Sequence, residues 1–317
     1  MDKDSAVQHI PVMLEEVVEL LGCKPGGIYV DGTLGGGGYT RAILEAGASV
    51  VVAMDWDVEA VERAGKALGD YGERLVLERA DFADVGGVLS KNGLGEVDGV
   101  VVDLGVSSFQ IDEARRGFSF TKEGPLDMRM NRQLPQTAAD LVNTLPEEEL
   151  ANLIFRYGEE RRSRKIARAV VAARAKKRID NTLELAELIA WAVPRTRDTL
   201  RIHPATRTFQ ALRIAVNREL ESLERFLPEA LEVLRPGGRL CAVSFHSLED
   251  RIVKGAFREW ARSCRCPPER ILCECEGRPL VRLLTRKALR PGSDEVERNP
   301  RARSARLRAV QKLSPVR

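Results

Sequence analysis

The sequence predicts an α/β fold with a Rossmann-like parallel sheet that is interrupted by an inserted all-helical domain. Three observations support this fold class. Strand and helix patterns alternate over about the first hundred residues. Only helical patterns follow between residues 109 and 209, and strand patterns then return. The chain of 317 residues is long enough for two domains.

The first part of the chain contains four short β-rich segments. Residues 50–54 are continuously apolar, which is typical of a parallel strand buried on both faces. We expect strands at 28–31, 50–55, 75–79 and 97–104, with helices at 11–21, 39–46 and 58–68.

The predicted insertion spans residues 109–209, and the α/β domain is formed by 1–108 and 210–317. Helices are expected at 137–141, 147–157, 161–177 and 183–193. A long amphipathic helix at about 209–234 should follow, ended by Arg235–Gly238. A strand at 239–245 and two β-like segments at 280–284 and 305–310 could complete the sheet.

A glycine turn joins the first strand to the next helix. The strand ends at Asp31, and the turn contains Gly35, Gly36, Gly37 and Gly38. Such a turn lets a cofactor approach the backbone closely. Asp31 would repel a pyrophosphate, whereas it would attract the amino-acid end of S-adenosylmethionine. The alternative is a merely flexible turn.

Two further residues are candidates for cofactor contacts. Asp55 ends the second strand, at the spacing where such folds place a carboxylate on ribose hydroxyls. Phe82 follows the third strand, where an aromatic edge could stack on adenine. Alternatively, Asp55 is only an acid on the surface, and Phe82 only packs in the hydrophobic core.

Asp103 is the candidate catalytic residue. It ends the fourth strand, and a methyl acceptor such as an amine needs a hydrogen-bond acceptor to localise its lone pair. Ser107 and Ser108 follow as candidate substrate contacts. Asp103 could instead only orient the cofactor. His246, after a later strand, could be a base or a substrate contact, and a hydrogen-bonded structural residue is the alternative.

Positive charge is concentrated in two segments. The net charge is only +3, but residues 156–180 carry +7 and residues 282–317 carry +8. Such segments suit a polyanion, although a solvated helix face and a frayed C-terminal segment are alternatives. Arg207 and Arg213, near the end of the insertion, could contact phosphate or lock the domain junction.

Four of the six cysteines are clustered, at Cys264, Cys266, Cys273 and Cys275. Four thiols could hold zinc or include a redox-labile pair, but each pair of cysteines has one intervening residue instead of the two to four that are usual for zinc. Inert thiols are the favoured interpretation, so no metal site is firmly predicted.

No apolar segment approaches the ~18 residues that a membrane helix needs. Residues 1–4 also lack the basic start of a signal peptide. We therefore expect a cytoplasmic protein that does not bind membranes.

Several motifs resemble the RsmH (MraW) family of bacterial small-subunit ribosomal RNA (cytosine-N4) methyltransferases. They extend over nearly the whole chain and are long and specific. The motifs are DGTLGGGG at 31–38, DLGVSS at 103–108, GFSF at 117–120, GPLDMRM at 124–130, HPATRTFQ at 203–210, SFHSLEDR at 244–251 and NPRARS at 299–304.

The resemblance implies a class I methyltransferase domain interrupted by a helical substrate domain. It also implies S-adenosylmethionine as the methyl donor. The implied acceptor is the N4 amine of the decoding-centre cytidine at position 1402 of 16S rRNA, within the small ribosomal subunit. The implied cofactor contacts are Gly37, Gly38, Tyr39, Asp55, Phe82, Asp103 and Gln110.

The chain departs from the family pattern at Tyr39, where the glycine loop commonly ends in histidine. A backbone contact would survive this change, whereas a side-chain contact would not necessarily do so. The chain also lacks the Asn/Asp/Ser-Pro-Pro-aromatic motif of other amine methyltransferases, so the catalytic role of Asp103 is not inherited from them.

Two other function classes stay open. A nicotinamide-dependent oxidoreductase would bind NAD tightly. A non-catalytic RNA-binding or ribosome-assembly factor would bind RNA without S-adenosylmethionine.

Overall fold

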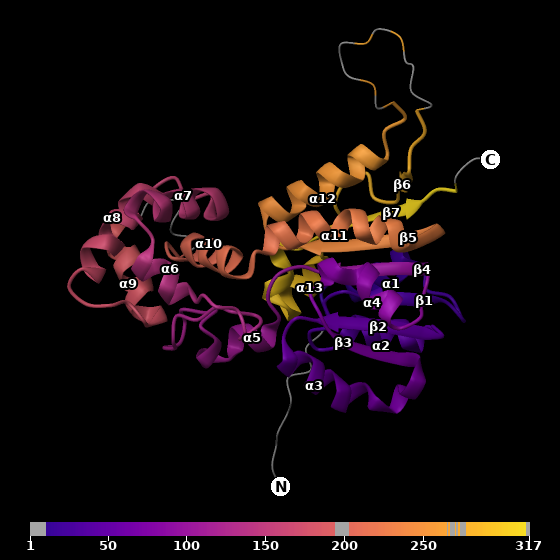
Figure 1. Ribbon diagram of the computed structural model, residues 1–317, viewed down its shortest axis with the longest axis horizontal. Coiled ribbons are helices and arrows are strands. Elements are labelled where there is room, and N and C mark those ends of the chain that lie inside the picture. Colours follow the sequence, from indigo (N-terminus) through magenta and orange to yellow (C-terminus); the bar gives the residue numbers. More distant parts are fainter. Residues whose placement is uncertain are drawn as a thin grey trace. The chain divides into compact units, whose positions relative to one another are not determined.

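The computed structural model describes residues 11–193, 203–264, 266, 270, 272 and 277–314 (Figure 1). The chain divides into two compact units. The sheet unit comprises Met1–Gly105 and Leu220–Arg317, and the helical unit comprises Val106–Glu219. These units are defined by packing. The predicted limits of the functional domains remain predictions, with the α/β domain at 1–108 and 210–317 and the inserted helical domain at 109–209.

A seven-stranded sheet with the order β3-β2-β1-β4-β5-β7-β6 forms the centre of the sheet unit. The strands β1 to β5 are parallel, and β7 and β6 are antiparallel additions at one side. The bounds are β1 Ile28–Asp31, β2 Val50–Asp55, β3 Leu75–Arg79, β4 Val97–Asp103, β5 Leu234–Ser244, β6 Val281–Leu283 and β7 Arg306–Lys312. This arrangement confirms the predicted Rossmann-like class I sheet.

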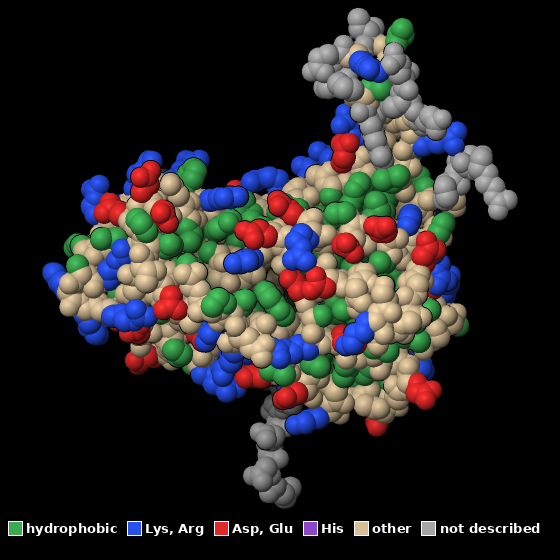
Figure 2. Space-filling view, in the orientation of Figure 1, with side chains coloured by type: hydrophobic (Ala, Val, Ile, Leu, Met, Phe, Trp, Pro, Cys, Tyr) green, Lys and Arg blue, Asp and Glu red, His purple; other side chains and the backbone are tan. Residues whose placement is uncertain are grey.

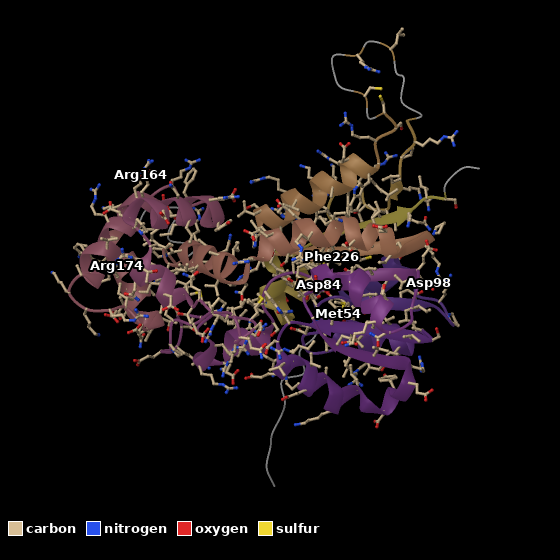
Figure 3. All side chains as sticks on the ribbon, in the orientation of Figure 1. Met54, Asp84, Asp98, Arg164, Arg174 and Phe226 are labelled. Carbon is tan, nitrogen blue, oxygen red and sulfur yellow. The ribbon has the colours of Figure 1, made fainter. Side chains whose placement is uncertain are left out.

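Helices cover both faces of the sheet, and its central strands are therefore buried on both sides. Val100 and Val102 face a cluster that includes Phe226 and Met54 (Figure 3), whereas Val101 between them faces a second cluster. The helices of this unit are α1 Leu14–Leu21, α2 Gly38–Glu45, α3 Val58–Leu68, α4 Val85–Lys91, α11 Glu219–Val233, α12 Ser247–Trp260 and α13 Ser293–Arg298. The 3-10 turns are η1 Gly69–Arg74, η2 Phe82–Asp84 and η5 Pro300–Ser304.

The helical unit has its own hydrophobic core, which includes Leu150, Ile166 and Leu185. Its elements are α5 Ser108–Asp112, η3 Ala114–Arg116, α6 Ala138–Thr144, α7 Glu147–Gly158, α8 Ser163–Arg174, α9 Thr182–Ala192 and α10 Thr206–Asn217. The glycine-bearing motifs at its start are packing elements. A Cβ atom at Gly117 would lie 2.2 Å from the Pro125 carbonyl oxygen.

The expectation of one helix over 209–234 is wrong. The chain forms α10 and α11, because Arg218 between them adopts a left-handed conformation with φ of 51°. The Asn217 side chain accepts a hydrogen bond from Met130 N and donates one to Met128 O, which holds the end of α10. No glycine or proline marks this break, so the apolar periodicity continued across it.

The strand expected at 239–245 begins earlier, at Leu234. Its first residues pair with β4 across a register shift between Val97 and Gly99. The Arg235–Gly238 segment therefore ends the helix as expected but also belongs to the strand. No helix in the described part of the chain is both long and apolar enough to cross a bilayer.

Candidate active site

Three carboxylates end neighbouring parallel strands at the middle of the sheet. Asp31 on β1 is level with Ala53 on β2 and with Val101 on β4. Asp55 and Asp103 are each two residues further along these neighbours, so all three acids lie at one edge. The strand order reverses between β1 and β4, and ligands of open α/β sheets bind outside the carboxyl ends at this point.

Asp31 is buried beneath the glycine turn. Its Oδ1 accepts a hydrogen bond from Thr33 N at 3.1 Å, and its Oδ2 accepts one from the Thr40 hydroxyl at 2.7 Å. Burial raises the pKa of Asp31 to about 6, against the lowering effect of these hydrogen bonds. Asp31 therefore fastens α2 to the strand. The sequence suggested that Asp31 lies at the open mouth of the turn, where it could contact a ligand directly. In the structure it is buried, so it would attract a cationic ligand only through its charge.

Asp55 holds the other side of the turn. Its Oδ2 accepts a hydrogen bond from Gly35 N and its Oδ1 accepts one from Asp57 N, both at 2.8 Å. Burial raises the pKa of Asp55 to about 6. Each oxygen retains a lone pair, so the carboxylate can also accept ribose hydroxyls.

The glycines have distinct roles in the turn. Gly35 and Gly37 have positive φ angles of 50° and 78°, which side chains rarely adopt. Gly36 is exposed. At Gly38, a Cβ atom would lie 2.0 Å from Pro11 Cγ. Pro11 therefore packs directly on the first turn of α2, which is where a dinucleotide pyrophosphate would approach.

We expect Gly38→Ala to lower the melting temperature, because the added methyl group would overlap Pro11. Overpacking of this kind costs about 1–3 kcal/mol, which corresponds to several degrees in a protein of this size. Calorimetry of the purified variant measures this loss. Gly69→Ala is the matched control, since nothing lies within 4 Å of its added Cβ. Equal melting of both variants would contradict the packing at Gly38.

Tyr39 faces the N-terminal segment, not the open turn. Its side chain is buried and its hydroxyl donates a hydrogen bond to Val12 O. Met13 N donates to Glu295 Oε1 of α13 at 2.7 Å, which fastens the same segment. Burial raises the pKa of Tyr39 well above its ordinary value, and the charges of Asp103 and Asp31 raise it further. The phenol therefore stays neutral, and its hydroxyl is already engaged by Val12.

Asp103 differs from the other two acids in its hydrogen bonds. Its backbone N donates to the Thr33 hydroxyl at 2.6 Å, but its Oδ1 is shielded and has no hydrogen-bond partner among the described residues. Burial raises the pKa of Asp103 well above its ordinary value, and the negative charges of Asp31 and Glu249 raise this pKa further. A shielded oxygen without a donor is costly to bury, so it suits a bound cation or an N–H group.

Phe82 begins η2 beside the glycine turn. A Cβ atom at Gly32 would lie 3.2 Å from the Cβ of Phe82. The ring packs edge-on against Phe226, with centroids 5.2 Å apart. Core packing and adenine contact are compatible here because Phe82 is only half-buried. The adenine contact remains a prediction.

His246 caps α12. Its Nδ1 accepts a hydrogen bond from Glu249 N at 3.4 Å, and the Glu249 Oε2 accepts from Phe245 N at 2.8 Å and from His246 N at 3.2 Å. This capping box gives the histidine a structural role. Sequence reasoning missed Glu249, although the acid three residues after the cap was the available signal. A catalytic role for His246 remains a hypothesis.

The candidate residues of the helical unit are held by local contacts. Ser107 and Gln110 form the capping box of α5, which begins at Ser108. The Arg213 guanidinium donates to both carboxylate oxygens of Glu219, at 2.9 and 2.8 Å. Arg207 lies 3.6 Å from Glu160 and is about half-exposed. Their proposed ligand contacts remain predictions, and Arg213 already has a carboxylate partner.

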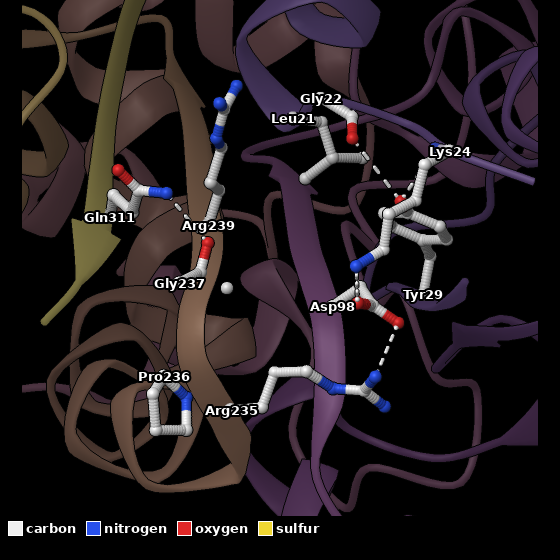
Figure 4. Close-up of a pocket in the computed structure, with 11 residues that line it drawn as sticks. Leu21, Gly22, Lys24, Tyr29, Asp98, Arg235, Pro236, Gly237, Arg239 and Gln311 are labelled. Atoms are coloured by element: carbon white, nitrogen blue, oxygen red, sulfur yellow. Dashed lines mark hydrogen bonds and ion pairs between the residues drawn. The ribbon is translucent and has the colours of Figure 1, made fainter. Parts of the chain in front are cut away.

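A cavity lies at the opposite, amino edge of the sheet (Figure 4). Among the residues that line it, Asp98 forms ion pairs with Lys24 Nζ at 2.7 Å and with Arg235 at 3.2 Å. It also accepts a hydrogen bond from Ile28 N at 2.9 Å. Because two cations pair with this carboxylate, Asp98 is not a free acceptor for an incoming group.

The cysteine cluster is only partly described. Cys264 is exposed and Cys266 is half-buried, whereas Cys273 and Cys275 lie outside the described residues. The candidate zinc site therefore stays untested. Cys23 and Cys241 are core thiols, and burial raises the pKa of Cys23 to about 11.

Comparison with known proteins places the chain in a family. The model of the MraW methylase family matches residues 6–313. Ribosomal RNA small subunit methyltransferase H of Syntrophobacter fumaroxidans is 66% identical over 314 residues and covers 98% of each chain. The protein of the same name from Geobacter sulfurreducens is 54% identical, over 96% of this chain and 99% of its own. The resemblance noted in the motifs is thereby confirmed, and the chain belongs to the MraW methylase family.

Proposed function

We propose that this enzyme transfers a methyl group from S-adenosylmethionine to the N4 amine of a cytidine in small-subunit ribosomal RNA. The specific acceptor would be the decoding-centre cytidine at position 1402 of 16S rRNA. The observation that carries the chemical part is the group of three strand-end carboxylates, of which Asp103 has a shielded oxygen, Oδ1, without a donor among the described residues. The names of the relatives support ribosomal RNA as the acceptor.

The residues present fit S-adenosylmethionine. Asp55 can accept its ribose hydroxyls, and the carboxylates of Asp31 and Asp103 suit a cation in their ionised forms. Pro11 covers the α2 terminus on which a pyrophosphate would otherwise bind. When bound, the cofactor supplies an electrophilic methyl group. These features also disfavour the nicotinamide-dependent oxidoreductase.

Asp103 would act on the acceptor base. The lone pair of an exocyclic amine is delocalised into the ring, which makes the nitrogen a weak nucleophile. A hydrogen bond from the amine to Asp103 Oδ1 would localise that lone pair and stabilise the positive charge that develops on nitrogen. Alignment of the amine is the other contribution of the site. The cytidine would be turned out of its helix to reach this depth.

The basic helical unit would hold RNA. Lys and Arg side chains lie among acidic ones over the α7 and α8 part of its surface (Figure 2), and Arg164 projects from α8 (Figure 3). Several cations nearby are already neutralised, since Arg178 contacts Asp140 and Asp180, and Lys177 contacts Glu184. Arg164 and Lys165 are exposed and have no acidic partner among the described residues. They are the better candidates for phosphate contacts.

The direct test is transfer of labelled methyl groups to 30S subunits from cells that lack the enzyme, with the modified nucleotide mapped. We expect one N4-methylated cytidine at position 1402. Naked 16S rRNA in a parallel reaction identifies the natural form of the substrate. Titration with S-adenosylmethionine and NAD separates the alternatives. NAD binding would indicate the oxidoreductase, and RNA binding without S-adenosylmethionine binding would indicate a non-catalytic factor.

A further inference from the structure

The end of the chain contains an arginine-rich segment that the proposed chemistry does not use. The segment from Arg298 to Ser314, both included, contains five arginines and one lysine, and no acidic residue. Arg306 and Arg308 are neutralised by Asp250, at 2.8 and 2.7 Å. The preceding motif, Asn299–Ser304, forms η5, on which Arg301 and Arg303 are exposed.

Strand register places η5 at the active-site edge of the sheet. β7 runs antiparallel to β5, and Arg306 is opposite Ser244, the last residue of β5. The residues before Arg306 therefore extend past the carboxyl end of β5. The neighbouring strand β4 ends at this same edge with Asp103, which is opposite Val243.

Buried contacts fix η5 beside the glycine turn. Ala302 and Ala305 are at most 1% exposed and belong to the hydrophobic cluster that contains Tyr39 and Val12. The adjoining helix α13 is fastened to the same segment through Glu295 and Met13. Pro300 begins η5 and restricts its backbone. The two arginines thus lie on a packed segment, on either side of the buried Ala302.

Arg301 and Arg303 present positive charge next to an acidic site. No carboxylate among the described residues forms an ion pair with Arg303. The strand-end acids repel an RNA backbone, whereas the cytidine that enters the site remains joined to its own phosphates. Cations at the rim of the site would attract these phosphates while the acids face the base and the cofactor.

We propose that Arg301 and Arg303 bind backbone phosphates of the RNA strand on either side of the target cytidine. This inference rests on the proposed function and assigns part of RNA binding to the sheet unit. The proposed ligand is the backbone of a single RNA strand, since the target cytidine would be turned out of its helix. Contacts to its phosphates would position the strand without reading its sequence.

The test compares the wild-type protein with Arg301→Ala/Arg303→Ala. We expect the affinity for 16S rRNA to fall about tenfold, and the slope of log affinity against log salt to decrease by about 1.4, for two lost contacts to a single strand. The KM for RNA should rise, while kcat at saturating RNA stays within about twofold. The Kd for S-adenosylmethionine should not change.

Lys66→Ala/Arg258→Ala is the matched control. It also removes two exposed cations, from the last turns of α3 and α12, which run back toward the amino edge of the sheet. Arg301→Lys/Arg303→Lys should restore most of the salt dependence because it retains the charge. Melting temperatures verify that each variant is folded.

Three results would overturn the inference. The first is an unchanged RNA affinity and salt slope in the alanine variant. The second is an equal loss in the control, which would indicate general electrostatic attraction. The third is a loss with assembled subunits but none with naked rRNA, which would indicate a ribosomal-protein contact. Failure of the proposed function would differ from all three, since the wild-type protein itself would not methylate rRNA.

Discussion

Asp103→Ala should abolish most methyl transfer while the protein still binds S-adenosylmethionine. Removing a positioned proton or hydrogen-bond acceptor costs about 10²- to 10⁴-fold in rate, and we expect kcat to fall within this range. Among the three strand-end carboxylates, Asp31 and Asp55 use both oxygens to accept hydrogen bonds from the turn, whereas Asp103 Oδ1 has no donor among the described residues. Single-turnover transfer to RNA and equilibrium cofactor binding should both be measured.

Glu96→Gln is the control for this experiment. Glu96 immediately precedes β4 at its other end and is exposed, so the substitution removes one negative charge without touching the site. Tight cofactor binding by Asp103→Ala together with a near wild-type rate would rule out the catalytic role. Loss of binding and rate in equal measure would assign Asp103 to cofactor orientation alone.

The pH dependence of transfer provides a second signature of Asp103. The ionised carboxylate is a stronger hydrogen-bond acceptor for the amine than the protonated acid, so the rate should rise with pH and then level off. Because burial raises the pKa of Asp103, this rise should occur at a higher pH than for an ordinary aspartate. The ascending limb should disappear in Asp103→Asn, and its persistence would assign it to another group.

Asp55→Asn should weaken S-adenosylmethionine binding by about 10- to 100-fold. Hydrogen bonds to a charged acceptor contribute about 1.5–3 kcal/mol, and the amide cannot accept at both positions. The substitution also disturbs Gly35 N and Asp57 N, which both donate to Asp55. Isothermal titration calorimetry measures the affinity directly.

Asp84→Asn is the matched control for Asp55→Asn. Asp84 is exposed and forms a surface ion pair with Arg225 at 2.9 Å, and such pairs contribute little to stability. Its cofactor affinity should equal that of the wild-type protein. An unchanged affinity in Asp55→Asn would show that Asp55 only supports the turn.

Local sequence patterns predicted most of the sheet. The strands at 28–31, 50–55 and 75–79 have the predicted bounds, because continuous apolar segments between turn residues are a local signal. The break at Arg218 could not be predicted in this way. It depends on Asn217 bonding to Met128 and Met130, which are far away in the sequence.

The sequence by itself determined the family, the order of the strands along the chain and the acids that end them. These features are encoded by short segments, whose periodicity and turn residues act locally. Only the tertiary structure decided the environment of each acid. Asp31 is buried and bonded to Thr40, Asp55 holds the turn, and Asp103 retains an oxygen without a donor.

The tertiary structure also decided what surrounds the glycine turn. Pro11 packs on Gly38, and η5 joins the same cluster from nearly 300 residues away along the chain. Burial, charge and hydrogen bonding depend on which segments meet, and parallel strands bring together residues that are distant in sequence. The chemical role of each site residue is therefore set by long-range packing, which no single segment contains.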